Sequence, residues 1–99
     1  MRNIPIAAVP NQELSVTLNG NRWVLTLKVG TNSMIADVVL NNQPIVLGQL
    51  IAVGTPIIPY EYLQGSGNFL LLVENDELPD WQKFNTTQQL VFVEPDEIA

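Results

Sequence analysis

Two residue types that carry much of enzyme chemistry are missing from this sequence. Its 99 residues contain neither cysteine nor histidine. Their absence excludes disulfides, thiolate zinc sites, cysteine nucleophiles, imidazole bases and any Ser-His-Asp triad. Only carboxylate, lysine and hydroxyl chemistry is left, and we expect no cofactor and no enzymatic activity.

Positive charge is also scarce, because four Lys and Arg residues stand against ten Asp and Glu residues. Residues 61–99 hold eight acids and Lys83 as their one base. A chain without a basic stripe does not match a phosphate backbone or an anionic membrane surface, so we expect neither nucleic acid nor membrane as a partner. Long apolar runs are missing too, and the N-terminal residues are too short and too interrupted by proline for a signal peptide.

The first clear pattern is a hairpin over residues 12–29. Apolar and polar residues alternate on both sides of Asn19-Gly20, as in half-buried strands. Both turn residues tolerate a positive φ, which favours a type I′ turn. Such a turn pairs Val16 with Trp23 and Leu14 with Leu25, apolar against apolar.

A second hairpin is predicted over residues 34–48, in MIADVVLNNQPIVLG. A two-residue turn at residues 41–42 would pair Val38 with Ile45 and Ala36 with Leu47. The spacing resembles that of the first hairpin, so we expect two hairpins of the same kind.

Further short apolar runs are bounded by Gly, Pro or Asn: QLIAVG, PIIPY, NFLLLVE and QLVFVE. They are too short for core helices and rich in residues that favour strands, so we predict strands, with one helical turn at LPDWQKF. The expected fold is all-β, a small single-domain antiparallel sandwich or barrel of about seven short strands. This domain would span residues 1–99, with an N-terminal arm at 1–10 and an acidic tail at 94–99. The arm could pair within its own domain or with a neighbour.

The acidic loop NDELPDWQKF is the most polar stretch that could form a site. Asp76, Glu77 and Asp80 lack the spacing and the glycine of a calcium loop, so we expect no metal there. A catalytic pair of Asp76 and Asp80 would lack a nucleophile, a base and an orienting group. Trp81 is expected to pack down as an anchor for the loop, or, if exposed, to offer a stacking surface.

Apolar residues make up 46% of the chain and charged residues only 14%. So small a domain has little room to bury all of QLIAVGTPIIPY, which predicts that part of it meets another subunit, with a homo-oligomer expected. The predicted interface residues are Ile51, Val53, Ile57, Ile58, Tyr60 and Trp81.

Four segments together resemble a known family: LNGNRWVLTL, MIADVVLNNQPIVLGQLI, PYEYLQGSGNFLLLV and LPDWQKFNTTQQLVFVEP. In order and pattern they are similar to the cyanophage-type baseplate plug of contractile-tailed bacteriophages, over nearly the whole chain. The resemblance implies a virion structural protein, made in the host cytoplasm, that acts as a plug or adaptor where tail tube, hub and spike proteins meet. It implies no catalytic residue and no cofactor.

One alternative stays open from the residues themselves. A β-rich scaffold with aromatic residues near its loops is also typical of a carbohydrate- or receptor-binding module, in which Trp81 or the pair Tyr60 and Tyr62 would form the stacking platform.

Overall fold

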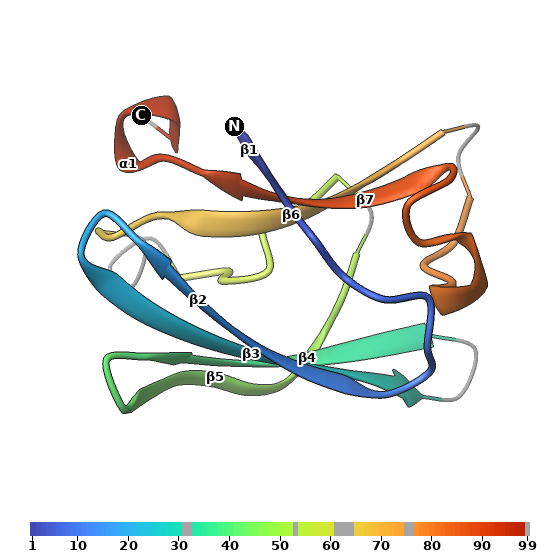
Figure 1. Ribbon diagram of the computed structural model, residues 1–99, viewed down its shortest axis with the longest axis horizontal. Coiled ribbons are helices and arrows are strands. Elements are labelled where there is room, and N and C mark those ends of the chain that lie inside the picture. Colours follow the sequence, from blue (N-terminus) through green and yellow to red (C-terminus); the bar gives the residue numbers. More distant parts are fainter. Residues whose placement is uncertain (31–32, 53, 61–64, 75–76, 99) are drawn as a thin grey trace.

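The computed structural model describes residues 1–30, 33–52, 54–60, 65–74 and 77–98. Seven strands in this part of the chain form two antiparallel sheets that pack as a sandwich (Figure 1). The three-stranded sheet has the order β1-β7-β6, with β1 at Arg2–Ile4, β6 at Asn68–Val73 and β7 at Gln88–Val93. The four-stranded sheet has the order β2-β3-β4-β5, with β2 at Gln12–Leu18, β3 at Asn21–Gly30, β4 at Ser33–Leu40 and β5 at Gln43–Leu50. The predicted all-β fold is confirmed, as a sandwich.

The helical content of the described residues is small. A 3-10 helix forms at Trp81–Lys83, where a single turn was predicted, and α1 covers Pro95–Ile98. No helix in this part of the chain is long and apolar enough to cross a membrane.

The β2–β3 hairpin has the predicted register. Val16 lies opposite Trp23 and Leu14 opposite Leu25. Asn19 and Gly20 have φ values of 54° and 79°, as a type I′ turn requires. The hairpin therefore directs Trp23 into the interior, where it is fully buried.

The β4–β5 hairpin has the predicted two-residue turn but not the predicted register. Both turn residues, at 41–42, have positive φ values. Beyond the turn, Val38 lies opposite Val46 and Ala36 opposite Gln49, because the register shifts once between Val39 and Val38 and again between Val38 and Ala36. The predicted pairing of these two residues with Ile45 and Leu47 is therefore wrong.

The Asp37 carboxylate forms a hydrogen bond across the hairpin at the place where the register is irregular. Asp37 Oδ1 accepts a hydrogen bond from the N–H of Gly48 at 2.6 Å, and Gly48 has a φ of 67°. A residue with positive φ and an off-register hydrogen bond are typical of a β-bulge. The irregularity leaves Leu47 in solvent, with 68% of its surface exposed.

Residues 56–60, predicted as a strand from PIIPY, form no strand in the structure. Ile57 donates one backbone hydrogen bond to the carbonyl of Phe69 in β6 (2.9 Å). Pro56 and Pro59 have no N–H to donate, so a regular ladder cannot form on both sides of Ile57. The predicted strand QLIAVG likewise ends at Leu50.

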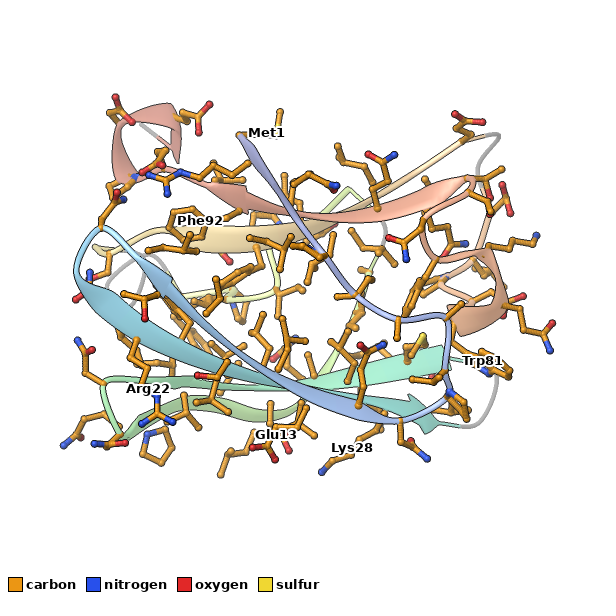
Figure 2. All side chains as sticks on the ribbon, viewed as in Figure 1. Met1, Glu13, Arg22, Lys28, Trp81 and Phe92 are labelled. Atoms are coloured by element: carbon orange, nitrogen blue, oxygen red, sulfur yellow. The ribbon has the colours of Figure 1, made fainter. Side chains whose placement is uncertain are left out.

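Three aromatic rings form the centre of the core. Trp23 meets Phe69 edge to face, with ring centroids 5.1 Å apart, and Phe92 lies 5.9 Å from Trp23 and 5.2 Å from Phe69. Phe92, labelled beside β6 and β7 in Figure 2, is fully buried in this core. Gly67 makes room for it: a Cβ at this position would lie 2.3 Å from the Phe92 ring, and the φ of Gly67 is 117°.

The N-terminal arm pairs within its own chain. Strand β1 runs antiparallel to β7, with Arg2 opposite Phe92 and Ile4 opposite Leu90, and Ile4 is buried in the core. Both ends of the described chain thus belong to one sheet.

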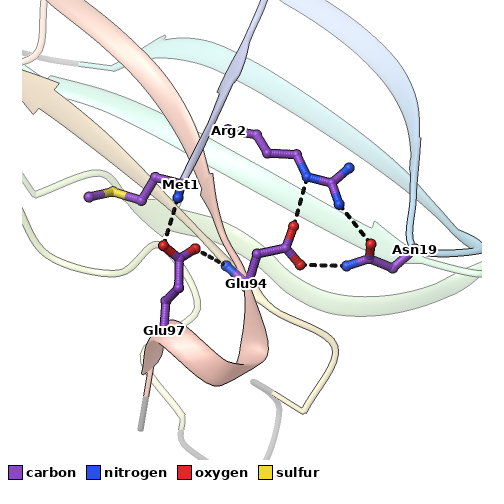
Figure 3. Close-up of polar contacts among 5 residues, drawn as sticks. All are labelled: Met1, Arg2, Asn19, Glu94 and Glu97. Carbon is purple, nitrogen blue, oxygen red and sulfur yellow. Dashed lines mark hydrogen bonds and ion pairs between the residues drawn. The ribbon is translucent and has the colours of Figure 1, made fainter.

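Polar contacts tie this end of the sandwich together (Figure 3). The Arg2 guanidinium pairs with Glu94 at 2.7 Å and also donates to Asn19 in the β2–β3 turn. Asn19 in turn donates to Glu94 at 2.6 Å. Glu97 accepts from the amino group of Met1 (2.7 Å) and from the N–H of Glu94 (2.8 Å). Glu94 and Glu97 of the acidic tail thus have partners within the chain.

Candidate functional site: exposed apolar surfaces and an end pocket

Three of the six predicted interface residues lie inside the molecule. Ile51, Ile57 and Ile58 are buried in the core. Ile57 and Ile58 point inward because residues 54–58 run beside the free edge of β6, to which Gly54 and Ile57 donate backbone hydrogen bonds. Within the chain these three side chains are already covered by the core. Tyr60 is 51% exposed, and Val53 lies outside the described residues.

Two of the most exposed apolar residues lie elsewhere, on the outer side of the four-stranded sheet. Leu47 and Leu50 of β5 are 68% and 56% exposed. Leu50 lies opposite Ile35, and Pro44 opposite Val39, on the face that points away from the core. We define these five residues as the β5 surface.

Charged side chains surround this sheet face. Figure 2 shows Glu13, Arg22 and Lys28 on the outer side of the four-stranded sheet. Lys28 Nζ lies 2.8 Å from Asp37. The hydrogen bond from Lys28, together with that from the N–H of Gly48, lowers the pKa of the Asp37 carboxyl.

A cavity of about 470 Å³ opens at the end of the sandwich that holds the 3-10 helix. The β3–β4 hairpin forms one side of the cavity and residues 77–83 form the other. Met34 lines it from the core, whereas Val29 and Leu78 line it from the surface, with 45% and 72% of their own surface exposed. We define this cavity as the end pocket.

Trp81 lies between the core and the end pocket. Its ring packs against the core cluster and is partly buried, as expected for an anchor, and it also lines the pocket. Figure 2 shows it at the end of the sandwich. Tyr62, predicted with Tyr60 as a stacking platform, lies outside the described residues.

A buried glutamine holds the loop beside the end pocket. Gln88 is fully buried at the start of β7. Its Oε1 accepts from the N–H of Asp80 (2.9 Å), and its Nε2 donates to the carbonyl of Leu78 (2.7 Å). The Asp80 carboxylate accepts from the N–H of Gln82 (3.0 Å) and so caps the 3-10 helix. The sequence pattern does not indicate that Gln88 holds the loop, because a pair of glutamines before an apolar run is typical of exposed positions.

The acids of the loop have structural partners. Lys83 Nζ lies 2.5 Å from Glu77. This contact lowers the pKa of the Glu77 carboxyl and raises the pKa of the Lys83 ammonium. No group of three acids placed to hold a metal ion is found in the described part of the chain. Asp76, which was weighed as a catalytic partner of Asp80, lies outside it.

Comparison with known proteins gives one family. A family model described as "Cyanophage baseplate Pam3 plug gp18" matches residues 1–96 of the chain. No curated protein matches the sequence of this chain. The matched range includes both sheets, the β5 surface and the end pocket, and it agrees with the resemblance seen in the hairpin and loop motifs. The chain therefore belongs to the cyanophage baseplate plug family.

Proposed function

We propose that this chain is the plug or adaptor at the centre of a contractile phage tail baseplate, at the junction of tail tube, hub and spike. Membership in a baseplate plug family indicates a structural role in the tail of the virion and association with other tail proteins. The match over residues 1–96 is the observation that carries this proposal.

The protein would act by shape and association. Leu47 and Leu50 expose more than half of their surface on the solvent-facing side of the four-stranded sheet. Burying both against a partner would contribute about 2–4 kcal/mol. Because β5 carries Pro44 and a bulge, a neighbouring strand cannot extend the ladder without interruption. Contact would therefore run through side chains of the β5 surface.

We include in this proposal that the plug is present in several copies. The β5 surface belongs to the four-stranded sheet, whereas Glu94 and Glu97 follow β7 in the other sheet (Figure 1). These two carboxylates therefore do not lie on the surface that two copies would share. Like charges, which destabilise contacts between protein surfaces, are kept apart in such an arrangement.

The first test is the location of the protein. Mass spectrometry of purified virions, with immunogold labelling of their tails, should find the chain at the baseplate. Its absence from virions would refute the proposal.

The second test addresses the β5 surface. The double variant Leu47→Asp, Leu50→Asp should remove the protein from assembled tails, and light scattering after size exclusion should show loss of any oligomer. Gln43→Asp, exposed on the same strand, adds charge without removing apolar surface and should assemble normally. Normal assembly of the double variant would show that the contact lies elsewhere.

The carbohydrate-binding alternative rests on one observation, the partly buried Trp81 in the wall of an open pocket. A glycan array probed with the full chain and with Trp81→Ala separates it from the proposal above. A glycan that binds the first protein and not the second would favour this alternative. Silence on the array would remove it.

A further inference from the structure

We infer that the end pocket receives an apolar side chain, with a lysine or arginine next to it, from a neighbouring protein of the tail. This inference rests on the proposed function, because it takes the partner to be a tail protein. The protein would then contact its neighbours at two places, through the end pocket and through the β5 surface.

The shape of the pocket fits a side chain. Its volume of about 470 Å³ lies within the range of ligand pockets, about 300–1,000 Å³. Met34 and Trp81 supply an inner apolar lining that packs on the core, and Leu78 and Val29 extend this lining outward to solvent. Leu78 is the most exposed large apolar side chain among the described residues, at 72%. An inserted side chain would cover this rim together with the interior.

The pocket is formed before a partner arrives. Gln88 holds the backbone on both sides of Pro79, through the N–H of Asp80 and the carbonyl of Leu78. The cap from Asp80 to Gln82 fixes the next turn. A loop held in this way loses little conformational freedom on binding, so more of the contact energy is available for affinity.

The charge of the pocket selects a basic partner. Two carboxylates, Glu77 and Asp80, line it together with the single ammonium of Lys83. Lys83 is paired with Glu77. Asp80 accepts from Gln82 through Oδ1, and its second oxygen accepts no hydrogen bond from the described residues. A positive side chain at the mouth of the pocket would meet this oxygen. The net charge of −6 on the chain likewise favours a positively charged partner.

The same contacts weigh against a sugar as the occupant. Sugar recognition needs several side-chain groups that are free to exchange hydrogen bonds with hydroxyls. Here Glu77 and Lys83 bond each other, and the surface rim is aliphatic.

The test measures binding of overlapping peptides from the tube, hub and spike proteins of the same phage. Fluorescence anisotropy with the full chain should identify peptides that carry an apolar residue beside Lys or Arg. Leu78→Ser should weaken the affinity for these peptides by roughly tenfold or more, because the apolar rim is lost. Asp80→Asn keeps an oxygen for the cap and should weaken the affinity for these peptides about two- to fivefold. The remaining affinity should depend less on salt concentration. Leu72→Ser, an exposed leucine of β6 that belongs neither to the end pocket nor to the β5 surface, should bind as the unmodified chain does.

Three results would overturn the inference: no peptide binds, Leu78→Ser binds as well as the unmodified chain, or a glycan occupies the pocket in a manner that depends on Trp81. If the protein is nevertheless found at the baseplate, only the role of the pocket fails. If the protein is absent from virions, the proposed function itself fails.

Discussion

Asn68 offers the sharpest test of how the core is held together. Its side chain is buried at the start of β6. Its Oδ1 accepts from the N–H groups of Ile58 (2.9 Å) and Phe69 (2.8 Å), and its Nδ2 donates to the carbonyl of Ile58 (2.8 Å). One amide thus fixes the segment that carries Ile57 and Ile58 into the core. Asn68→Ala removes three hydrogen bonds.

The expected loss in free energy of unfolding for Asn68→Ala is about 3 kcal/mol, at about 1 kcal/mol for each bond. Urea unfolding followed by tryptophan fluorescence should show the midpoint lowered by roughly 1–3 M. Asn3→Ala, at an exposed position of β1, should change stability by less than about 0.5 kcal/mol. If Asn68→Ala also stayed within that margin, the amide would not be holding the segment.

Asn68→Asp refines the test through its pH dependence. The carboxylate keeps the two acceptor contacts but faces the carbonyl of Ile58 without a proton to donate. Burial and this carbonyl should raise the pKa of the introduced carboxyl in the folded state. The destabilisation should therefore be absent below the ordinary aspartate pKa of about 4 and grow as the pH rises above it. A penalty that is equal at acidic and neutral pH would contradict this account.

Three further predictions concern stability. Gly67→Ala should destabilise the fold by roughly 2–5 kcal/mol, since its Cβ would collide with the Phe92 ring at a strained φ, whereas Gly65→Ala, with open space around it, should be nearly neutral in the same urea titration. Gln88→Leu should cost about 2 kcal/mol and speed hydrogen exchange in the loop before the 3-10 helix; unchanged exchange would show that the loop is held by other contacts. Asp37→Asn should destabilise at neutral pH, because the folded-state pKa of Asp37 is lowered, and the difference from the unmodified chain should vanish as the pH falls through and below that pKa; a difference that persists in acid would argue against an ionic origin.

The sequence predicted best where neighbours in the chain decide the structure. The alternation around Asn19-Gly20 determines both the turn and the pairing of Val16 with Trp23, since turn chemistry and burial favour the same register. The turn at 41–42 was predicted for the same reason. The register beyond it was missed, because the bond from Gly48 to Asp37 crosses the hairpin and leaves no trace in the pattern of apolar residues.

Long-range polar contacts explain the other differences. Asn68 and Gln88 each stand at the start of a strand, where a polar residue reads as surface, yet each binds the backbone of a loop ten residues away. The path of Ile57 and Ile58 into the core depends on contacts with Asn68 that the apolar pattern of PIIPY does not reveal, so this pattern predicts a strand that the structure does not contain.

The antiparallel pairing of β1 with β7 bears on how the protein responds to force. Arg2 stands opposite Phe92, so the start of the first strand lies beside the end of the last. Tension that pulls these two strand ends apart would open the backbone pairs one after another, instead of shearing all of them at once. The ion pair between Arg2 and Glu94 sits where such a pull would act first. Mechanical resistance along this direction would therefore be low, and added salt, which screens exposed charges, would lower it further.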